Sequence, residues 1–233
     1  MGLTEGQANS DVRLVAGATS AAPKRLSKTT AVILVVWLAA LFAGMAGLWK
    51  YKLTPGPSRS TRVLWPPQSH LPVHPGMPTL VLFAHPQCDC TRASLSELRI
   101  LTSRFGSRIA ATVVFLSPRD APLDWKHSAT WASAASIPGV RVLADDDGRE
   151  VSLFGAATSG HVLLYSGKGQ LLFSGGITPA RGHIGGSPQM DKLVRLLESE
   201  TTERVRTPLA THTADSTIVP GAIYGCPLEE PIP

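Results

Sequence analysis

From Thr79 to Gly106 the chain reads TLVLFAHPQCDCTRASLSELRILTSRFG, and the rest of the fold can be inferred outward from this stretch. Residues 79–84 are an apolar run that is typical of a buried strand. Leucines and a phenylalanine then recur at helical spacing at positions 95, 98, 101 and 105, and Gly106 follows where a helix C-cap would lie. Cys88 and Cys90 therefore stand where a strand turns into a helix.

This position gives the two thiols a chemical reason to be reactive. Backbone N–H groups in the first turn of a helix have no intrahelical partner, and the helix dipole favours negative charge there. A thiol at this place ionises more easily, and the thiolate is the form that attacks disulfides and binds metals. With Cys226 the chain has three cysteines, an odd number that leaves either one pair and a spare thiol or a site of three thiols.

A second apolar segment indicates a membrane anchor. Thr29 to Trp49 contains no charged residue and is long enough, as a helix, to cross the ~30 Å hydrocarbon core of a bilayer. Trp49 and Tyr51 lie where an interfacial aromatic belt is expected, and Trp-Lys-Tyr-Lys follows in place of a small-residue cleavage pattern. Lys and Arg are about equally frequent on its two sides, so the orientation is inferred from the cysteine chemistry: N-terminus cytoplasmic, C-terminal domain periplasmic or extracytoplasmic.

Composition limits the remaining possibilities. The chain has 233 residues, of which 43% are hydrophobic and 17% charged, and its net charge is +5; this suits one ordinary domain with appendages. The basic residues do not form a stripe interleaved with aromatics, so we expect no nucleic-acid partner. The predicted organisation is a disordered cytoplasmic tail, a transmembrane helix, a Pro-rich linker, a folded domain and a C-terminal tail carrying Cys226, over residues 1–28, 29–49, 50–77, 78–200 and 201–233.

Within the folded domain the patterns predict alternating strands and helices. Strands are expected at 80–84, 108–116, 140–143, 161–165 and 170–173, the last two forming a hairpin, and helices at about 89–105, 123–136 and 187–200. The first two strands are joined through a helix, so they should be parallel. The predicted fold class is α/β: a mixed sheet with helices on both faces, preceded by one transmembrane helix.

This order, with cysteine at the first strand–helix turn, resembles the thioredoxin fold. It is most similar to membrane-tethered thioredoxin-like proteins of the TlpA and ResA kind, and above all to bacterial RedB-type proteins. In that family a Cys-x-x-Cys is followed by Arg-Ala and by apolar residues, and here Cys88 is followed in the same register by Arg92, Ala93, Leu95 and Leu98. The resemblance implies that Cys88 is the attacking thiol of a thiol–disulfide oxidoreductase acting on a protein thiol or disulfide partner.

The chain departs from the family pattern at two places. Thr91 stands where the family has its second thiol, and Cys90 lies one residue early. The family's cis-proline, which faces the thiols and docks the substrate backbone, is also absent, because the corresponding stretch reads Thr158-Ser-Gly-His161. A Cys88–Cys90 disulfide would close a very small, strained ring. The sequence leaves both Cys90 and Cys226 open as partners of Cys88.

A metal carrier is the alternative function. Cys88, Cys90 and a histidine are ligands suited to copper or zinc, and the Sco-type copper chaperones are tethered thioredoxin folds that use two cysteines and a histidine, though their cysteines are spaced more widely. His161 is the first candidate ligand, followed by His85 and His183, and each could instead be a structural residue. The redox hypothesis needs no cofactor; the alternative needs copper. The Gly-rich segment Gly175–Gly186 lacks the ending of a nucleotide-binding loop and is interpreted as a connection.

Overall fold

The computed structural model describes residues 27–119, 125, 128–206 and 221–228. Of the N-terminal segment predicted to be disordered, all but Ser27 and Lys28 lies outside the described residues. The chain divides into two units, Met1–Ala46 and Gly47–Pro233, and each is described by itself.

The helix α1, Lys28–Leu53, contains the segment predicted to cross a membrane. None of its residues is buried, and its most apolar window has a mean hydropathy of 2.5. By length and composition, α1 is able to cross a bilayer.

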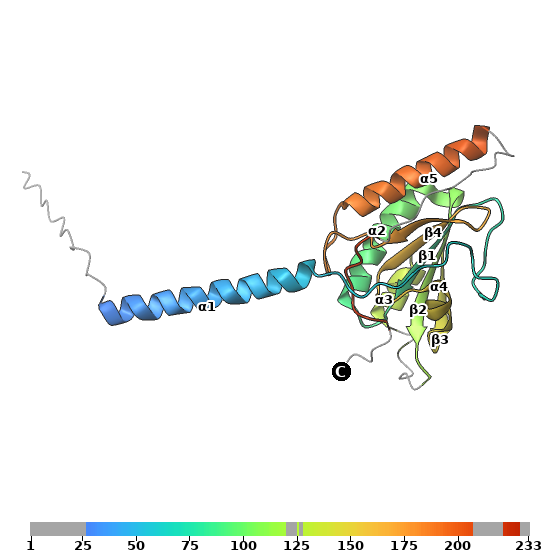
Figure 1. The fold of residues 1–233 in the computed structure, drawn as a ribbon. Helices are drawn as coiled ribbons and strands as arrows, with labels where there is room; N and C mark the ends of the chain where they lie inside the picture. Colours follow the sequence, from blue (N-terminus) through green and yellow to red (C-terminus); the bar gives the residue numbers. More distant parts are fainter. Residues whose placement is uncertain (1–26, 120–124, 126–127, 207–220, 229–233) are drawn as a thin grey trace, which may run out of the picture. The chain divides into compact units, whose positions relative to one another are not determined.

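The remaining elements alternate along the chain, as predicted (Figure 1). In order they are β1 (Thr79–Ala84), α2 (Asp89–Phe105), the short 3-10 helix η1 (Gly106–Arg108), β2 (Ala110–Ser117), α3 (Ala129–Ala135), β3 (Val140–Asp146), α4 (Arg149–Phe154), β4 (His161–Tyr165), β5 (Leu171–Gly175) and α5 (Pro188–Arg206).

One five-stranded mixed sheet organises the domain. Its strand order is β3-β2-β1-β4-β5. β1 pairs in parallel with β2, and β2 with β3, whereas β4 pairs antiparallel with both β1 and β5. The predicted parallel pair and the predicted hairpin are both confirmed. β1 lies at the centre of the sheet, so the strand that leads into the next turn is hydrogen-bonded to a neighbouring strand on each side.

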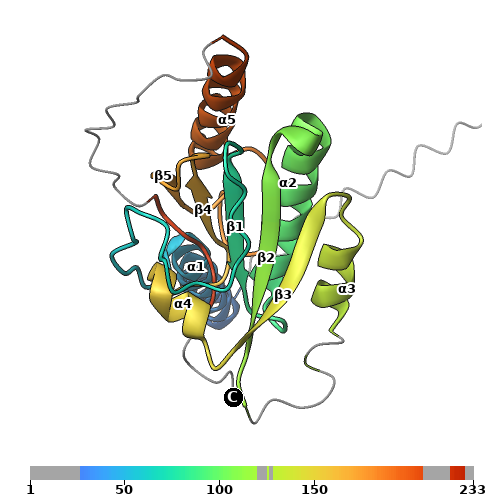
Figure 2. The same cartoon turned by 90° about the vertical axis from the view of Figure 1, so that its right-hand side faces the viewer.

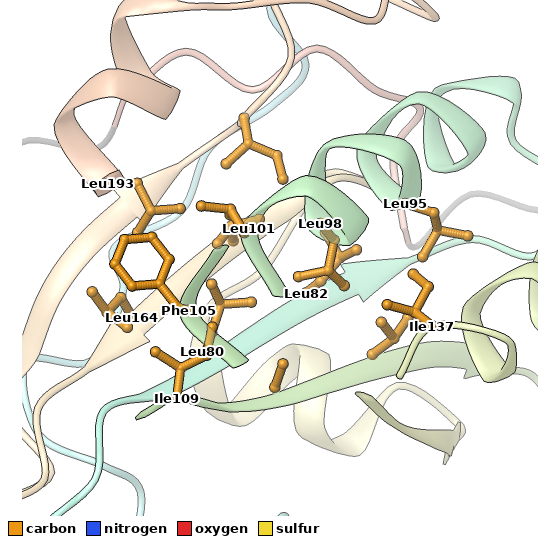
Figure 3. Close-up of a cluster of buried hydrophobic side chains, with 14 of the residues drawn as sticks. Leu80, Leu82, Leu95, Leu98, Leu101, Phe105, Ile109, Ile137, Leu164 and Leu193 are labelled. Carbon is orange, nitrogen blue, oxygen red and sulfur yellow. The ribbon is translucent and has the colours of Figure 1, made fainter. Parts of the chain in front are cut away.

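Three helices cover one face of the sheet. Leu98, Leu101 and Phe105 of α2 pack against alternate residues of β1, such as Leu80 and Leu82 (Figure 3). Residues of α3 and α5 complete the same cluster. The three- and four-residue spacing of apolar residues in α2 turns one side of this helix toward the sheet. This packing fixes the helix whose first turn carries the cysteines.

The opposite face is covered differently, by α4 and by segments without regular structure (Figure 2). Val151 and Phe154 of α4 pack there with Leu71, Leu228 and the inward-facing residues of β1, β2, β4 and β5. α4 was not predicted. The buried Asp145 side chain accepts hydrogen bonds from the N–H groups of Glu150 and Val151 at distances of 2.8 Å, so two backbone donors in the first turn of this helix are paired. Helices on both faces confirm the predicted fold class.

The Pro-rich segment before β1, which was predicted as a linker, is packed onto the domain. Trp65 N–H donates to Gly169 O at 2.8 Å, and Leu171 N–H donates to Val63 O at 2.7 Å. The Trp65 ring makes edge-to-face contacts with Phe154 and Tyr165, with centroids 5.1 Å apart in each case. The aromatic and apolar side chains of this segment supply the contacts.

Three further boundaries differ from the sequence predictions. The helix expected over 123–136 is limited to Ala129–Ala135 in the described residues. β3 extends past the predicted 140–143 to Asp146, and α5 extends past the predicted 187–200 to Arg206. In the C-terminal tail, residues 221–228 pack against the domain, with Ile223 and Leu228 buried. This last segment brings Cys226 to the site.

Candidate functional site

Cys88 is the N-cap residue of α2. Its backbone is extended, with φ −93° and ψ 124°, and its carbonyl accepts a hydrogen bond from Thr91 N–H at 3.0 Å. β1 ends at Ala84, and the turn of residues 85–87 carries the chain to Cys88, whose N–H donates to His85 O at 3.2 Å. The predicted position of Cys88 at the strand–helix junction is confirmed, and its side chain lies at the positive end of the helix dipole.

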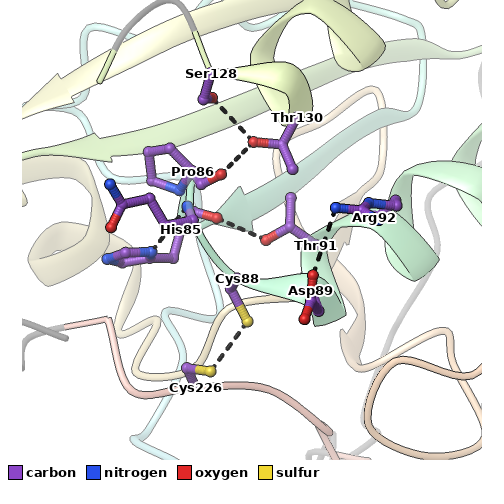
Figure 4. Close-up of polar contacts among 10 residues, drawn as sticks. His85, Pro86, Cys88, Asp89, Thr91, Arg92, Ser128, Thr130 and Cys226 are labelled. Carbon is purple, nitrogen blue, oxygen red and sulfur yellow. Dashed lines mark hydrogen bonds and ion pairs between the residues drawn. The ribbon is translucent and has the colours of Figure 1, made fainter. Parts of the chain in front are cut away.

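Cys226 lies directly against Cys88 (Figure 4). The two Sγ atoms are 3.1 Å apart, in hydrogen-bond contact, although the residues are separated by 138 positions in the sequence. A disulfide would require about 2.05 Å, so these are free thiols. Cys90 is buried in the first turn of α2. The structure thus brings all three cysteines into one neighbourhood.

The three thiols differ in their acidity. The pKa of Cys88 is lowered to about 4, chiefly by hydrogen bonding from the Cys90 side chain, with a further contribution from Cys226, while burial acts in the opposite direction. The pKa of Cys226 is raised to about 11 by burial and by its neighbour Cys88. The pKa of Cys90 is raised as well, because it donates to Cys88 and is buried. The cluster therefore carries one thiolate, on Cys88, and two protonated donors.

Thr91 has a structural role at the place where the family resemblance puts a second thiol. Its hydroxyl is fully buried; it donates to His85 O at 2.8 Å and lies 2.9 Å from Ser159 Oγ. Ser159 Oγ in turn accepts a hydrogen bond from His85 N–H at 3.0 Å. These bonds tie the turn before α2 to the segment before β4. Ser159 was not singled out from the sequence, although the absent proline had pointed to its stretch.

The segment before β4 also holds the C-terminal tail. Ser159 N–H donates to Cys226 O at 2.9 Å, and Leu228 N–H donates to Ala157 O at 2.9 Å. Between them, Thr158 and Pro227 form an isolated antiparallel bridge. These backbone contacts set the position of the Cys226 side chain beside Cys88.

Charged and polar groups surround the thiols. Asp89 and Arg92 form an exposed ion pair at 3.5 Å, and the Arg181 guanidinium donates to Gly225 O and opposes the rise in the pKa of Cys226. The backbone of Gly182 opposes the rise in the pKa of Cys90, and residues 181–184 of the Gly-rich segment form one side of the site. A pocket opens at this point, and its lining includes Gln87, Cys88, Asp89, Cys90, Arg92, Arg181, His183 and Cys226.

The candidate histidine ligands are not gathered with the cysteines as a metal site. Among the residues that the structure describes, no group of three His, Cys, Asp or Glu side chains is arranged to hold a metal ion. His161 is 1% exposed, its Nε2 lies 2.9 Å from Ser174 Oγ, and burial lowers its pKa to about 4. His85 Nδ1 accepts a hydrogen bond from Gln87 N–H, and the exposed His183 lines the pocket. Among the described residues, His161 therefore lies apart from the cysteine cluster, and the copper alternative stays a hypothesis.

Comparisons with known proteins bear on the fold. The structure is similar to an uncharacterized conserved protein from Geobacillus kaustophilus, with a TM-score of 0.51, 11% identity, and coverage of 77% of this chain and 93% of that one. A hypothetical protein from Sinorhizobium meliloti matches with a TM-score of 0.49, 18% identity, and coverage of 76% and 94%. The pneumococcal exposed lipoprotein thioredoxin from Streptococcus pneumoniae matches with a TM-score of 0.41, 17% identity, and coverage of 54% and 87%.

No protein-family model matches the chain, and no curated protein matches it. The order of strands, the antiparallel hairpin and the helices on both faces make this a thioredoxin-like fold, as the resemblance implied. These similarities concern the fold alone, and the chemistry has to be argued from the site.

Proposed function

We propose that this protein is a membrane-anchored thiol–disulfide oxidoreductase in which Cys88 and Cys226 are the exchanging pair. The observation that carries this proposal is the 3.1 Å contact between the two Sγ atoms at the N-terminus of α2. Cys88 supplies a thiolate that its neighbours stabilise, and Cys226 supplies a thiol close enough to resolve the bond that Cys88 forms.

The reaction takes two exchange steps. The Cys88 thiolate attacks a client disulfide, one client sulfur leaves as a thiolate, and Cys88 is joined to the client by a mixed disulfide. Cys226 then loses its proton to the departing thiolate or to solvent and attacks Cys88 Sγ, which releases the second client thiolate and leaves a Cys88–Cys226 disulfide. A dithiol donor returns the pair to the reduced form. Read in reverse, the oxidised pair gives its disulfide to a client dithiol.

Cys90 is better suited to lowering the pKa of Cys88 than to resolving the mixed disulfide. Its thiol is the largest cause of the lowered pKa of Cys88, and its own pKa is raised, so it remains a protonated donor. A bond between cysteines two residues apart is strained. The Cys88–Cys226 bond joins segments that are already in contact, and its partners need to approach by only about 1 Å.

The proposed location follows from chemistry and from α1. An exchanging disulfide is sustained in an oxidising compartment, so we place the domain outside the cytoplasm, with residues 29–49 in the bilayer and the N-terminus inside. We also propose that the chain is related to RedB-type proteins, and the sequence motif around Cys88 supports this. The substrate would be a protein thiol or disulfide accessible from the membrane surface.

The test is turnover by the full chain in detergent, with insulin as client and a dithiol donor as reductant, measured above the rate of the donor alone. We expect Cys88→Ser to abolish turnover. When the donor, which would itself reduce a mixed disulfide, is left out, Cys226→Ser should stop after one exchange and accumulate a mixed disulfide. Cys90→Ala, the matched control, should still turn over. A Cys88→Ser variant as active as the parent would reject the function, and a mixed disulfide that accumulates in Cys90→Ala but not in Cys226→Ser would assign the resolving role to Cys90.

A further inference from the structure

The tip of the C-terminal segment, residues 224–227, is held beside Cys88 almost entirely through its backbone. Cys226 O accepts from Ser159 N–H, and Gly225 O accepts from the Arg181 guanidinium. On either side of the tip, Ile223 and Leu228 are buried and anchor the segment. Tyr224, Cys226 and Pro227 themselves are only partly buried. The tip is therefore a short segment whose two flanking residues are anchored by burial, while the tip itself is held mainly by backbone hydrogen bonds.

Backbone contacts of this kind do not depend on the identity of the side chains. The Ser159 N–H and the Ala157 carbonyl are paired with the tail in the manner of an added antiparallel strand. Any extended peptide can present a carbonyl and an N–H in the same way, which is the basis of recognition by strand addition. The surface that holds the tip is thus able to hold a segment of another protein.

One position in the tip carries a strict steric requirement. A Cβ placed on Gly225 would lie 1.8 Å from Ser159 O and 3.0 Å from Thr158 Cγ2. The first contact is with backbone and cannot be relieved by a change of side-chain rotamer. Only glycine fits immediately before the cysteine in this arrangement.

The docked tip also limits access to the nucleophile. Cys88 is 3% exposed, and Cys226 Sγ lies against its sulfur. A client segment that pairs with Ser159 in the register of the tip would bring its own sulfur to the position that Cys226 Sγ now occupies beside Cys88. A client and the tip cannot both be present there.

We infer that the tip occupies the client's place: an extended client segment with Gly-Cys displaces residues 224–227, pairs with Ser159, and presents its cysteine to Cys88. Once the mixed disulfide has formed, the client backbone leaves Ser159 and the client sulfur turns to the far side of Cys88 Sγ. The tip then returns, and Cys226 attacks Cys88 Sγ in line and releases the client thiolate. This inference rests on the proposed function and adds to it the class of client and a self-blocking element. The chain's own Tyr224-Gly-Cys-Pro227 serves as an internal copy of the client sequence.

The experiment measures single exchanges on the full chain in detergent, in the Cys226→Ser background, where the tip keeps its backbone but cannot resolve. The probes are two peptides, AIYGCPL and AIYACPL, whose cysteines carry thionitrobenzoate in disulfide linkage, and a small symmetric aryl disulfide. Cys88 attacks the peptide sulfur, the thionitrobenzoate anion leaves and is read by its absorbance, and mass analysis locates the mixed disulfide on Cys88.

We expect the glycine peptide to react at least about tenfold faster than the alanine peptide, which corresponds to ~1.4 kcal/mol. Gly225→Ala, which displaces the tip, should accelerate the glycine peptide several-fold more than the small disulfide. Gly186→Ala is the matched control, because a Cβ there meets nothing within 4 Å, and it should change neither rate.

Three results would overturn parts of this account, and they differ from one another. Equal rates for the two peptides would refute the glycine requirement, and this comparison needs no variant of the tip. Equal acceleration of the peptide and the small disulfide by Gly225→Ala would show that the tip limits access to Cys88 in general and does not occupy the client's binding site. Failure of Cys88 to react with any probe, the small disulfide included, would reject the proposed function itself.

Discussion

At the scale of single residues, the charge on Cys88 is set by its neighbours. Hydrogen bonds from Cys90 and Cys226 lower its pKa to about 4 and outweigh burial, and the helix N-terminus acts in the same direction. Because a lowered pKa keeps the ionised form present as the pH falls, Cys88 should react as a thiolate throughout the neutral range. Its charge is lost only when the pH approaches the lowered pKa.

This argument predicts the pH profile of alkylation. In the Cys226→Ser protein, where the serine hydroxyl remains a donor, the rate of alkylation of Cys88 by iodoacetamide should be flat across neutral pH and fall in acid, with a midpoint near 4. Cys90→Ala removes the largest cause of the shift, so the midpoint should move upward. Mass spectrometry of the alkylated peptide measures the rate. A midpoint at an ordinary thiol value of about 8.5 would contradict the account.

The sequence was enough to place Cys88 at the start of a helix, but it was not enough to show which thiol lies beside Cys88. The apolar run before it and the helical spacing after it are local patterns, and they placed the thiol at a helix start. The approach of Cys226 depends on backbone bonds between Ser159 and the tail, which no local pattern encodes. His161 was a reasonable ligand from its place near the hairpin, yet it is buried and paired with Ser174. The positions of Cys226 and His161 both depend on contacts between residues far apart in the sequence, which local patterns do not encode.

At the scale of elements, α2 is held by one apolar face, and this makes a direct comparison possible. Leu98 is fully buried against the sheet, whereas Ile100, on the same helix, is 53% exposed. Leu98→Ala should lower the free energy of unfolding by about 2–5 kcal/mol, through lost burial and the cavity left behind. Ile100→Ala should change it by less than about 0.5 kcal/mol. Urea unfolding of the full chain in detergent measures both, and similar losses at the two positions would show that α2 does not pack as described.

Long elements with a clear period were predicted well, and short ones were not. The predicted bounds of α2 are confirmed at both ends, because many turns of regular spacing define them. α4 covers only Arg149–Phe154, between Gly148 and Gly155, and six residues are too few to show a helical period. The N–H groups of its first turn are bound by the Asp145 carboxylate, which lies outside the helix and is not part of any helical period.

At the scale of the whole domain, two segments without regular structure complete one face of the sheet. Trp65 and Leu71 come from the Pro-rich stretch, and Leu228 comes from the C-terminal tail. Gly56 N–H donates to Ile223 O at 2.8 Å, so the two segments also bind each other. Composition predicted the first as a Pro-rich linker, but composition does not reveal which surface such a segment covers. The packing of these segments is what delivers Cys226 to the site.

The central claim is that Cys88 pairs with Cys226, and thiol mapping of the full chain tests it most directly. The reduced protein is exposed to oxidised glutathione, free thiols are alkylated, and the digested peptides are identified by mass without reduction. The account predicts a Cys88–Cys226 disulfide with Cys90 recovered as an alkylated free thiol. A Cys88–Cys90 disulfide, or a lasting mixed disulfide between Cys88 and glutathione with Cys90 and Cys226 both alkylated, would contradict it.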